Sequence, residues 1–295
     1  MKQILIKTTL FIFFIAAFSF KTDKPAYLIF DKEGKKVDYK EMIQSALNCD
    51  VVFFGELHDN PICHWLELEV ATSLFDAKKA DLMMGSEIFE TDNQLIVNEY
   101  VEKKIKASSF EAEAKLWKNY KSDYRALLNY ARDHQIPFIA TNVPRRYASK
   151  VNASGFEALD SVSREAKSYF APMPIQFDAE LDCYKKMLEK DTSATATGST
   201  HSSLNTAKAQ ALKDATMANS IAEAWKKGKL FYHINGSYHS DNFESIIWHL
   251  KHYKKNLKIL TISTIEKKGD LVPDSSEVKL ADYIISIPEN MSKSY

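Results

Sequence analysis

Two Gly-x-x-His turns, each placed directly after a short apolar run, constrain this chain of 295 residues more than any other feature. The first, Gly55-Glu56-Leu57-His58, follows residues 51–54, and the second, Gly236-Ser237-Tyr238-His239, follows residues 230–234. Short apolar, aromatic-rich runs bounded by glycine are typical of buried strands. Ligands bind outside the carboxyl ends of strands in open α/β sheets, so the two histidines predict a single site at that edge.

Two further strands end in polar residues. Glu87 lies at the end of the apolar run that begins at residue 82, and residues 136–141 lead into Asn142 and then Arg145. A mixture of carboxylates, imidazoles and a guanidinium suits a metal ion or an anionic ligand. The residues expected to converge at the four strand ends are Glu56, His58, Glu87, Asn142, Arg145 and His239.

The remaining segments alternate between helical and strand patterns, which predicts an α/β fold with a mostly parallel central sheet flanked by helices. The segments expected to be helical are 39–47, 61–75 and 242–252, and those expected to be strands are 27–30, 259–263 and 283–287. Residues 152–225 show no convincing strand, so we expect an inserted helical lid there. Its Ser/Thr-rich run at 192–203, which includes His201, is too polar to order itself and is expected to be solvated.

The amino-terminal segment has the pattern of a secretory signal, with a basic start, a short apolar core and small residues near its end. We expect cleavage after residue 19, a mature single domain over residues 20–295, and export to the periplasm or cell envelope. An uncleaved membrane anchor is the alternative, although the apolar stretch is short beside the roughly 20 residues that a spanning helix needs. No cysteine follows the apolar core, so lipid attachment there is not indicated.

Composition excludes some classes of protein. Lys+Arg and Asp+Glu both total 39 over the whole chain, so nothing is basic enough for non-specific binding of nucleic acid. Three cysteines without a Cys-x-x-Cys spacing indicate neither a disulfide framework nor a thiolate zinc site, although one pair could cross-link in an oxidising compartment.

Several other polar residues have a plainer interpretation. Cys63 and His64 fall in the helical pattern after Pro61 and are expected to be packing residues. His249 and His252 stand among lysines and predict a basic solvent-exposed face rather than a metal pair. Gln210, Asp214 and Met217 share one helical stretch and could close over a ligand, but a solvated helix surface is the safer interpretation.

The motifs, in their order, resemble those of the ChaN family of exported haem-binding proteins, which is grouped with the Tiki, TraB and erythromycin-esterase-like proteins. The matching segments are 53–60, 85–90, 124–145 and 209–218. The resemblance implies haem as the cofactor and a role in haem and iron acquisition, with a homodimer and an outer-membrane uptake system left open as partners. The residues that it suggests for cofactor binding are Tyr124, Asn142, Arg145, Tyr147, Met217 and Tyr238, with Arg145 or Arg146 on the propionates.

The same resemblance carries an alternative of a different class. In the related superfamily members, paired Gly-x-x-His motifs with an intervening Glu are associated with metal-dependent hydrolysis. Here His58, Glu87 and His239 would hold a divalent metal ion, and Glu56 would act as general base on its water. The Ser/Thr-rich run and the absence of a lipid-attachment cysteine depart from a typical family member.

Overall fold

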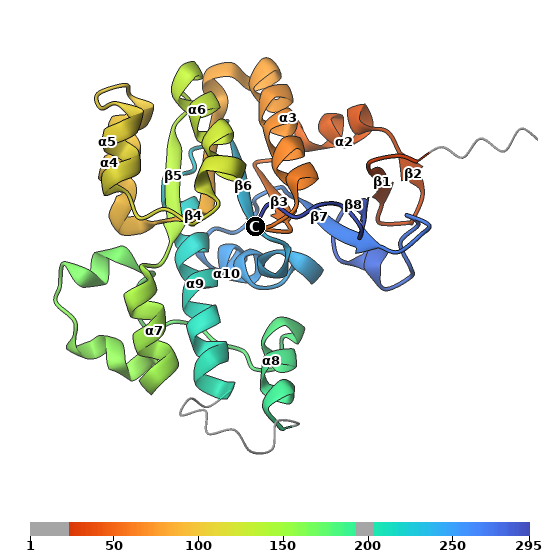
Figure 1. Cartoon of the computed structure of the whole chain (residues 1–295). Helices are drawn as coiled ribbons and strands as arrows, with labels where there is room; N and C mark the ends of the chain where they lie inside the picture. The colour runs from red at the N-terminus through yellow and green to blue at the C-terminus, as the bar shows by residue number, and fades with distance from the viewer. Residues whose placement is uncertain (1–23, 193–202) are drawn as a thin grey trace, which may run out of the picture.

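The computed structural model describes residues 24–192 and 203–295. The predicted signal segment and His201 therefore lie outside the described residues. A central sheet of eight strands in the order β2-β1-β8-β7-β3-β6-β4-β5 organises the molecule (Figure 1). The strands are β1 Leu28–Asp31, β2 Lys36–Val37, β3 Val51–Glu56, β4 Leu82–Glu90, β5 Phe138–Asn142, β6 Leu230–Gly236, β7 Ile259–Lys267 and β8 Tyr283–Pro288.

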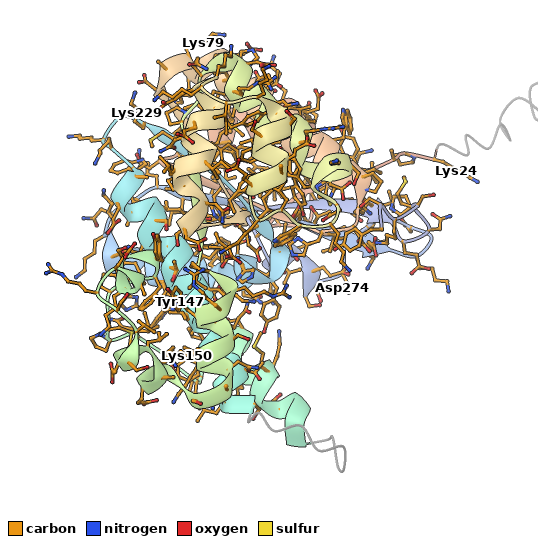
Figure 2. All side chains as sticks on the ribbon, turned by 60° about the vertical axis from the view of Figure 1, so that its left-hand side comes forward. Lys24, Lys79, Tyr147, Lys150, Lys229 and Asp274 are labelled. Atoms are coloured by element: carbon orange, nitrogen blue, oxygen red, sulfur yellow. The ribbon has the colours of Figure 1, made fainter. Side chains whose placement is uncertain are left out.

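Six of these strands are parallel, and β1 pairs antiparallel with both β2 and β8. The prediction of a mostly parallel sheet is confirmed, and the expected strands at 27–30, 259–263 and 283–287 are β1, β7 and β8. Figure 2 shows Lys79 and Lys229, just before β4 and β6, at the opposite end of the molecule from Lys150. The parallel strands therefore begin at one end of the molecule and direct their carboxyl ends toward the other.

Helices cover both faces of the sheet. The α-helices are α2 Tyr39–Ala46, α3 Pro61–Lys78, α4 Gln94–Val101, α5 Ala107–Glu113, α6 Arg125–His134, α7 Arg145–Ser154, α8 Asp182–Thr192, α9 Ser203–Ala224 and α10 Ile246–Tyr253. In β3, Val52 and Phe54 pack under α2, α3 and α6, whereas Val51 and Phe53 pack on α9 and α10. Because both faces are covered, every residue of β3 is buried, as expected for a central parallel strand.

Local sequence explains where these helices begin and end. Asp38 caps α2 by accepting the backbone N–H of Glu41, and Asn60 caps α3 ahead of Pro61. The helical stretch between Thr91 and His134 is broken, because α4 and α5 are followed by a π-helical turn, Tyr120–Tyr124, before α6. Most aromatic residues of this stretch lie in the core that α3 covers.

The predicted helical segment at 152–225 contains the end of α7, then α8 and α9. Helix α9 packs on β5, α7 and α10, so it covers the sheet as a layer of the fold (Figure 1). Helix α8 packs outside it through Cys183 and Tyr184 against Ala207 and Ala211. Among the described helices, none is long and apolar enough to cross a membrane.

His249 differs from its prediction. The α10 face that packs against α9 and the sheet carries Ile246, Ile247 and Leu250, and His249 shares that face with 1% of its surface exposed. Its Nε2 lies 3.3 Å from the Tyr184 hydroxyl. Burial lowers the pKa of His249 to about 4, so it is a neutral core residue rather than part of a basic surface. His252, three residues on, is exposed as predicted.

Gly55 allows the end of β3 to pack closely against β7 and against the turn that follows β6. A Cβ atom there would lie 2.9 Å from the Ser237 Cα and 3.1 Å from the Ile262 carbonyl oxygen. Both are backbone atoms and cannot rotate away. We therefore expect Gly55→Ala to lower the free energy of unfolding by about 1–3 kcal/mol, measured by urea denaturation. Ser149→Ala, on the exposed face of α7, is the control. An unchanged midpoint for Gly55→Ala would contradict this packing account.

Candidate functional site

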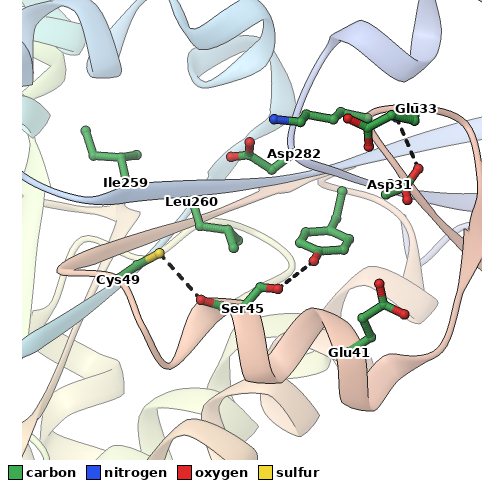
Figure 3. Close-up of a pocket in the computed structure, with 10 residues that line it drawn as sticks. Asp31, Glu33, Glu41, Ser45, Cys49, Ile259, Leu260 and Asp282 are labelled. Carbon is green, nitrogen blue, oxygen red and sulfur yellow. Dashed lines mark hydrogen bonds between the residues drawn. The ribbon is translucent and has the colours of Figure 1, made fainter.

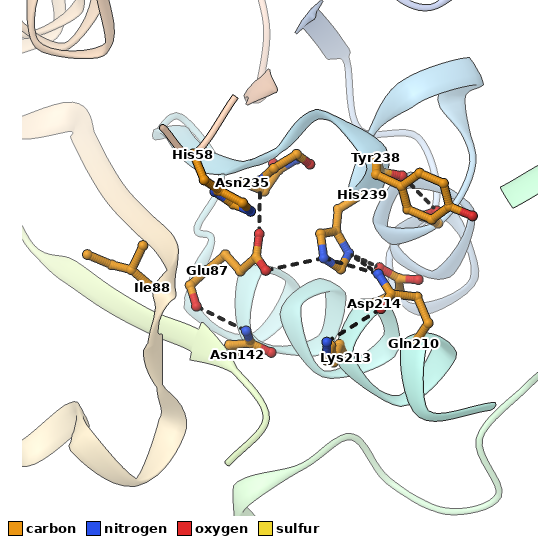
Figure 4. Close-up of polar contacts among 12 residues, drawn as sticks. His58, Glu87, Ile88, Asn142, Gln210, Lys213, Asp214, Asn235, Tyr238 and His239 are labelled. Carbon is orange, nitrogen blue, oxygen red and sulfur yellow. Dashed lines mark hydrogen bonds and ion pairs between the residues drawn. The ribbon is translucent and has the colours of Figure 1, made fainter. Parts of the chain in front are cut away.

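The two Gly-x-x-His turns leave the sheet side by side. Strands β3 and β6 are parallel neighbours, with Glu56 opposite Gly236, so the turns that follow them emerge at the same edge. His58 and His239 flank Glu87, which extends from β4 on the other side of β6 (Figure 4). Glu87 Oε1 lies 3.2 Å from His239 Nε2, and Glu87 Oε2 accepts the Gly236 N–H at 2.9 Å. Residues far apart in the sequence thus meet at one site, as the motif spacing predicts.

Gly236 makes room for this arrangement. A Cβ atom at this residue would lie 2.7 Å from His58 Nε2 and 3.6 Å from Glu87 Oε2. The missing side chain is therefore what allows the imidazole of the first motif to lie over the backbone of the second. Each glycine of the two motifs serves a close approach that any side chain would block.

His239 is buried between two carboxylates. Its Nδ1 lies 2.5 Å from Asp214 Oδ1, opposite the contact of Nε2 with Glu87. Burial alone would lower the pKa of His239, but Glu87 and Asp214 outweigh it and raise the pKa to about 10. Burial alone would raise the pKa of Glu87, yet His239 and His58 lower it to about 2. His239 is thus an imidazolium at neutral pH, with both ring nitrogens engaged.

The predicted place of Asp214, on a solvated helix surface, is wrong. Asp214 is fully buried in α9 and also accepts the Tyr184 hydroxyl at 2.9 Å. Gln210, one turn earlier, approaches both ring nitrogens of His239 at 3.1 Å. The available signal was the spacing of four residues between an amide, Gln210, and an acid, Asp214, on one alanine-rich helix.

A second polar layer lies behind His58. Glu56 Oε1 accepts from His58 Nδ1 and from the Tyr124 hydroxyl, both at 2.7 Å. Glu56 is 2% exposed, whereas the His58 side chain is 35% exposed and lies edge-on to Trp117 at 4.9 Å. Burial alone would lower the pKa of His58, but hydrogen bonding to Glu56 raises it. The sequence suggested Glu56 as a general base at the sheet edge. In the structure Glu56 is buried and is connected to that edge only through its hydrogen bond to His58.

Asn142 and the two arginines take different places. Asn142 Nδ2 donates to the Glu87 carbonyl oxygen at 3.1 Å, and its Oδ1 is buried without a hydrogen-bond partner. Arg145 is exposed at the start of α7, and its backbone N–H donates to Glu90 Oε1 at 3.0 Å. Arg146 pairs with Asp92 at 2.5 Å. Asn142 thus belongs to the site, and the arginines lie on the surface beyond it.

The remaining predicted cofactor residues are mostly inaccessible. Tyr124 is buried at 1% exposure with its hydroxyl on Glu56, and Tyr147 at 8% packs against Phe170. Met217 is fully buried in the core between α9 and the sheet and does not reach the carboxyl edge, because its helix turns that face inward. Tyr238 is 38% exposed, and its hydroxyl donates to the Cys183 carbonyl oxygen.

His64 proves to be more than a packing residue. Cys63 is fully buried in the apolar core, but His64 lies 3.1 Å from Glu56 Oε2 and 3.4 Å from Glu67 Oε2 through its Nδ1. The three cysteines, Cys49, Cys63 and Cys183, are unpaired. The described residues therefore contain no disulfide.

A hollow of about 420 Å³ lies at the opposite edge of the sheet, where β7 and β8 begin and β1 ends (Figure 3). Asp282 in its wall accepts the backbone N–H of Thr261 at 2.9 Å, and Ser45 bonds the Tyr283 hydroxyl at 2.7 Å. These polar groups serve to fasten the strands and α2. The hollow lies at the amino ends of the parallel strands, whereas His58 and His239 lie at their carboxyl ends.

The ion pair of His239 predicts a defined pH dependence. A folded pKa above the unfolded value near 6.5 gives stabilisation that is complete below that pH and is lost as pH rises through about 10. Asp214→Asn should lower the free energy of unfolding by about 1–3 kcal/mol at pH 6, and this difference from wild type should shrink toward pH 10. Urea titrations across this range measure it, with the exposed Asp160→Asn as control. A deficit that does not change with pH would contradict the assigned charge on His239.

Known proteins resemble this chain in sequence profile and in fold. The profile of the haem-binding uptake family, Tiki superfamily, ChaN, matches residues 42–250. No curated protein sequence matches the chain. A solved structure of cofacial heme binding to ChaN of Campylobacter jejuni is 18% identical to this chain. The two match over 88% of this chain and 96% of that one with a TM-score of 0.67, which shows a shared fold.

Two further solved structures are more distant. A succinoglycan biosynthesis protein is 12% identical over 84% of this chain and 90% of its own, with a TM-score of 0.48. The type III effector HopBA1 is 15% identical over 84% and 92%, with a TM-score of 0.44. Neither likeness carries a functional argument. The family profile spans more than half of the chain, and the resemblance predicted from the motifs is confirmed: this chain belongs to the ChaN family of the Tiki superfamily.

Proposed function

We propose that this protein binds haem at the carboxyl edge of its sheet and acts in haem and iron acquisition after export. Membership of a haem-binding uptake family is the observation that carries this proposal. Export rests on the amino-terminal sequence pattern. A homodimer and an outer-membrane uptake system are the partners proposed with it.

The side chains at this edge suit haem iron. Histidine and tyrosine are both known axial ligands of haem. Among the three tyrosines predicted from sequence, Tyr238 is exposed by more than a third, whereas Tyr124 and Tyr147 are buried. We therefore assign the iron ligand to Tyr238, which must release the Cys183 carbonyl oxygen to bind. His58, with its half-buried ring next to Trp117, offers a second contact for the porphyrin.

Cations near the edge would meet the propionates. Arg145 is exposed, and Lys213 lies half-buried on α9, 3.5 Å from Gln210 Oε1 (Figure 4). Charge-assisted hydrogen bonds from guanidinium or ammonium groups to carboxylates are stronger than neutral ones. Arg146 is already paired with Asp92, so Arg145 is the better of the two arginines for this role.

Haemin titration tests the assignment. Wild type should give a saturable, shifted Soret band, and Tyr238→Phe should weaken binding at least tenfold, about 1.4 kcal/mol, and alter the visible bands because the iron loses an oxygen ligand. Tyr124→Phe and Tyr147→Phe are matched controls that should retain the wild-type spectrum. A spectrum identical to that of haemin with an unrelated protein would remove the proposal, and loss confined to Tyr124→Phe would move the ligand.

A hydrolase is the second candidate, favoured by the convergence of His58, Glu87 and His239. Perturbed pKa values in a cluster of acids and imidazoles often mark catalytic sites. The donor set, however, is satisfied within the protein. His239 uses one ring nitrogen on Glu87 and the other on Asp214, so it could ligate a metal ion only by giving up one of them. These residues therefore fit a metal ion poorly, which favours the binding protein.

Glu87→Gln separates the two functions, since the amide keeps the size of the side chain and removes its charge. Turnover of small esters and peptides with manganese, cobalt or zinc, and haemin affinity, are measured on wild type and variant. We expect no metal-dependent turnover in either protein and haem affinity within about threefold, less than 1 kcal/mol. Metal-dependent turnover in wild type that disappears in Glu87→Gln would establish the hydrolase instead.

A further inference from the structure

A separate polar cluster lies beneath the candidate site, between β3 and α3. Its members are Glu56, His64 and Glu67, exposed by 2%, 7% and 0%. One potential ligand atom from each lies within 4.8 Å of the others. Glu87 and His239 are not members of this set, and His58 touches it through Glu56. The cluster therefore lies behind the edge at which haem binding is proposed and joins that edge through Glu56.

The spacing of the ligand atoms matches a coordination shell. His64 Nδ1 lies 3.1 Å from Glu56 Oε2 and 3.4 Å from Glu67 Oε2. With metal–ligand bonds of about 2.1 Å, neighbouring ligands stand about 3.0 Å apart in octahedral and about 3.4 Å apart in tetrahedral geometry. The two contacts of His64 thus already have the separation that a small divalent ion imposes on its ligands, and the ligand atoms of Glu56 and Glu67 lie within 4.8 Å of each other.

Two carboxylate oxygens in the cluster lack a hydrogen bond. Glu56 Oε2 and Glu67 Oε1 are fully buried, and neither has a partner of acceptable geometry. Buried polar atoms are satisfied in the great majority of cases, so two orphans in one cluster call for a missing ligand. Within the described part of the chain, no other pair of carboxylates leaves oxygens unsatisfied side by side.

The surrounding contacts orient the cluster as an outer shell orients metal ligands. His64 Nε2 lies 3.2 Å from the His58 carbonyl oxygen, so a proton on Nε2 leaves the Nδ1 lone pair facing the two acids. Glu56 Oε1 is held by Tyr124 and His58, which leaves Oε2 to face inward. Hydrogen bonds of this kind fix the tautomer and ring orientation of ligating histidines.

Charge points the same way. Two carboxylates and one imidazole carry net negative charge in a buried space, which is costly without a compensating cation. A divalent ion with a neutral His64 makes the cluster neutral. Two carboxylate oxygens and one imidazole nitrogen suit first-row ions such as Mn²⁺, Fe²⁺ and Zn²⁺.

We propose that Glu56, His64 and Glu67 hold a divalent first-row transition-metal ion in a closed site. Because its ligands come from β3 and α3, the ion fastens the central strand to the helix that covers it. Glu56 also holds His58 through its other oxygen, so the ion stiffens the loop that carries the proposed haem contact. The site is structural, since no ligand is open to solvent.

Metal binding by the full chain tests this proposal. Chelator-treated protein is titrated with Mn²⁺, Zn²⁺ and Co²⁺ by calorimetry, with the visible absorption of Co²⁺ as a second readout. Wild type should bind one equivalent, and Glu67→Gln should bind at least tenfold more weakly. Glu69→Gln, the same change on the exposed side of α3, and Glu87→Gln, at the sheet edge, should bind as wild type does.

Thermal unfolding with and without chelator distinguishes the ion from a proton shared by the two acids. Removing the ion should lower the Tm of wild type and leave that of Glu67→Gln unchanged. The proposal would be overturned if the wild type bound no ion and its Tm did not change with chelator. Loss of binding in Glu87→Gln with Glu67→Gln intact would overturn it too. If Glu67→Gln does not fold, wild-type crystals grown with Mn²⁺ decide, since they must show an anomalous scattering peak between the three side chains.

Discussion

The in-register parallel pairing of β3 with β6 is the constraint on which the rest of the structure depends. It sets Glu56 opposite Gly236, so two turns far apart in the sequence leave the sheet together. Backbone packs on backbone at Gly55, and an imidazole lies against Gly236. Shifting this register by one residue would turn the apolar residues of β3 to the opposite faces and separate His58 from Glu87. Fold and site therefore share one cause.

Buried charge is concentrated around this pairing in two layers. In the outer layer, the single imidazolium of His239 pairs with both Glu87 and Asp214, and all three residues are buried. In the inner layer, Glu56, His64 and Glu67 lie together, and each has less than a tenth of its surface exposed. Such groups are kept in a core only with partners. The first layer has its partners within the chain, and the second is where we infer an ion.

Periodicity and strand-end logic predicted the sheet, its parallel character and the meeting of His58, Glu87 and His239. These follow from local patterns combined with one rule about sheet edges. Asp214 and His249 escaped that reasoning because helix burial depends on what packs above each face, which a charge pattern does not reveal. The resemblance suggested Met217 and Tyr124 as cofactor-binding residues. Both are buried instead, because large apolar side chains fill the space between the helices and the sheet. The contacts that Gln210 and Asp214 of α9 make with His239 had no signal in the sequence beyond the spacing of those two residues.

The central place of β3, with β7 on one side and β6 on the other, has a consequence for motion. A strand hydrogen-bonded on both sides opens only when the whole domain unfolds, and its amides exchange at the slowest rate in such a fold. The loop bearing His58 is anchored to that strand, whereas Tyr238 contacts α8 at the periphery. Release of the Tyr238 hydroxyl from the Cys183 carbonyl oxygen therefore involves the outer helix α8 rather than the central strand. Hydrogen exchange should accordingly be faster at the amides of α8 than at those of β3.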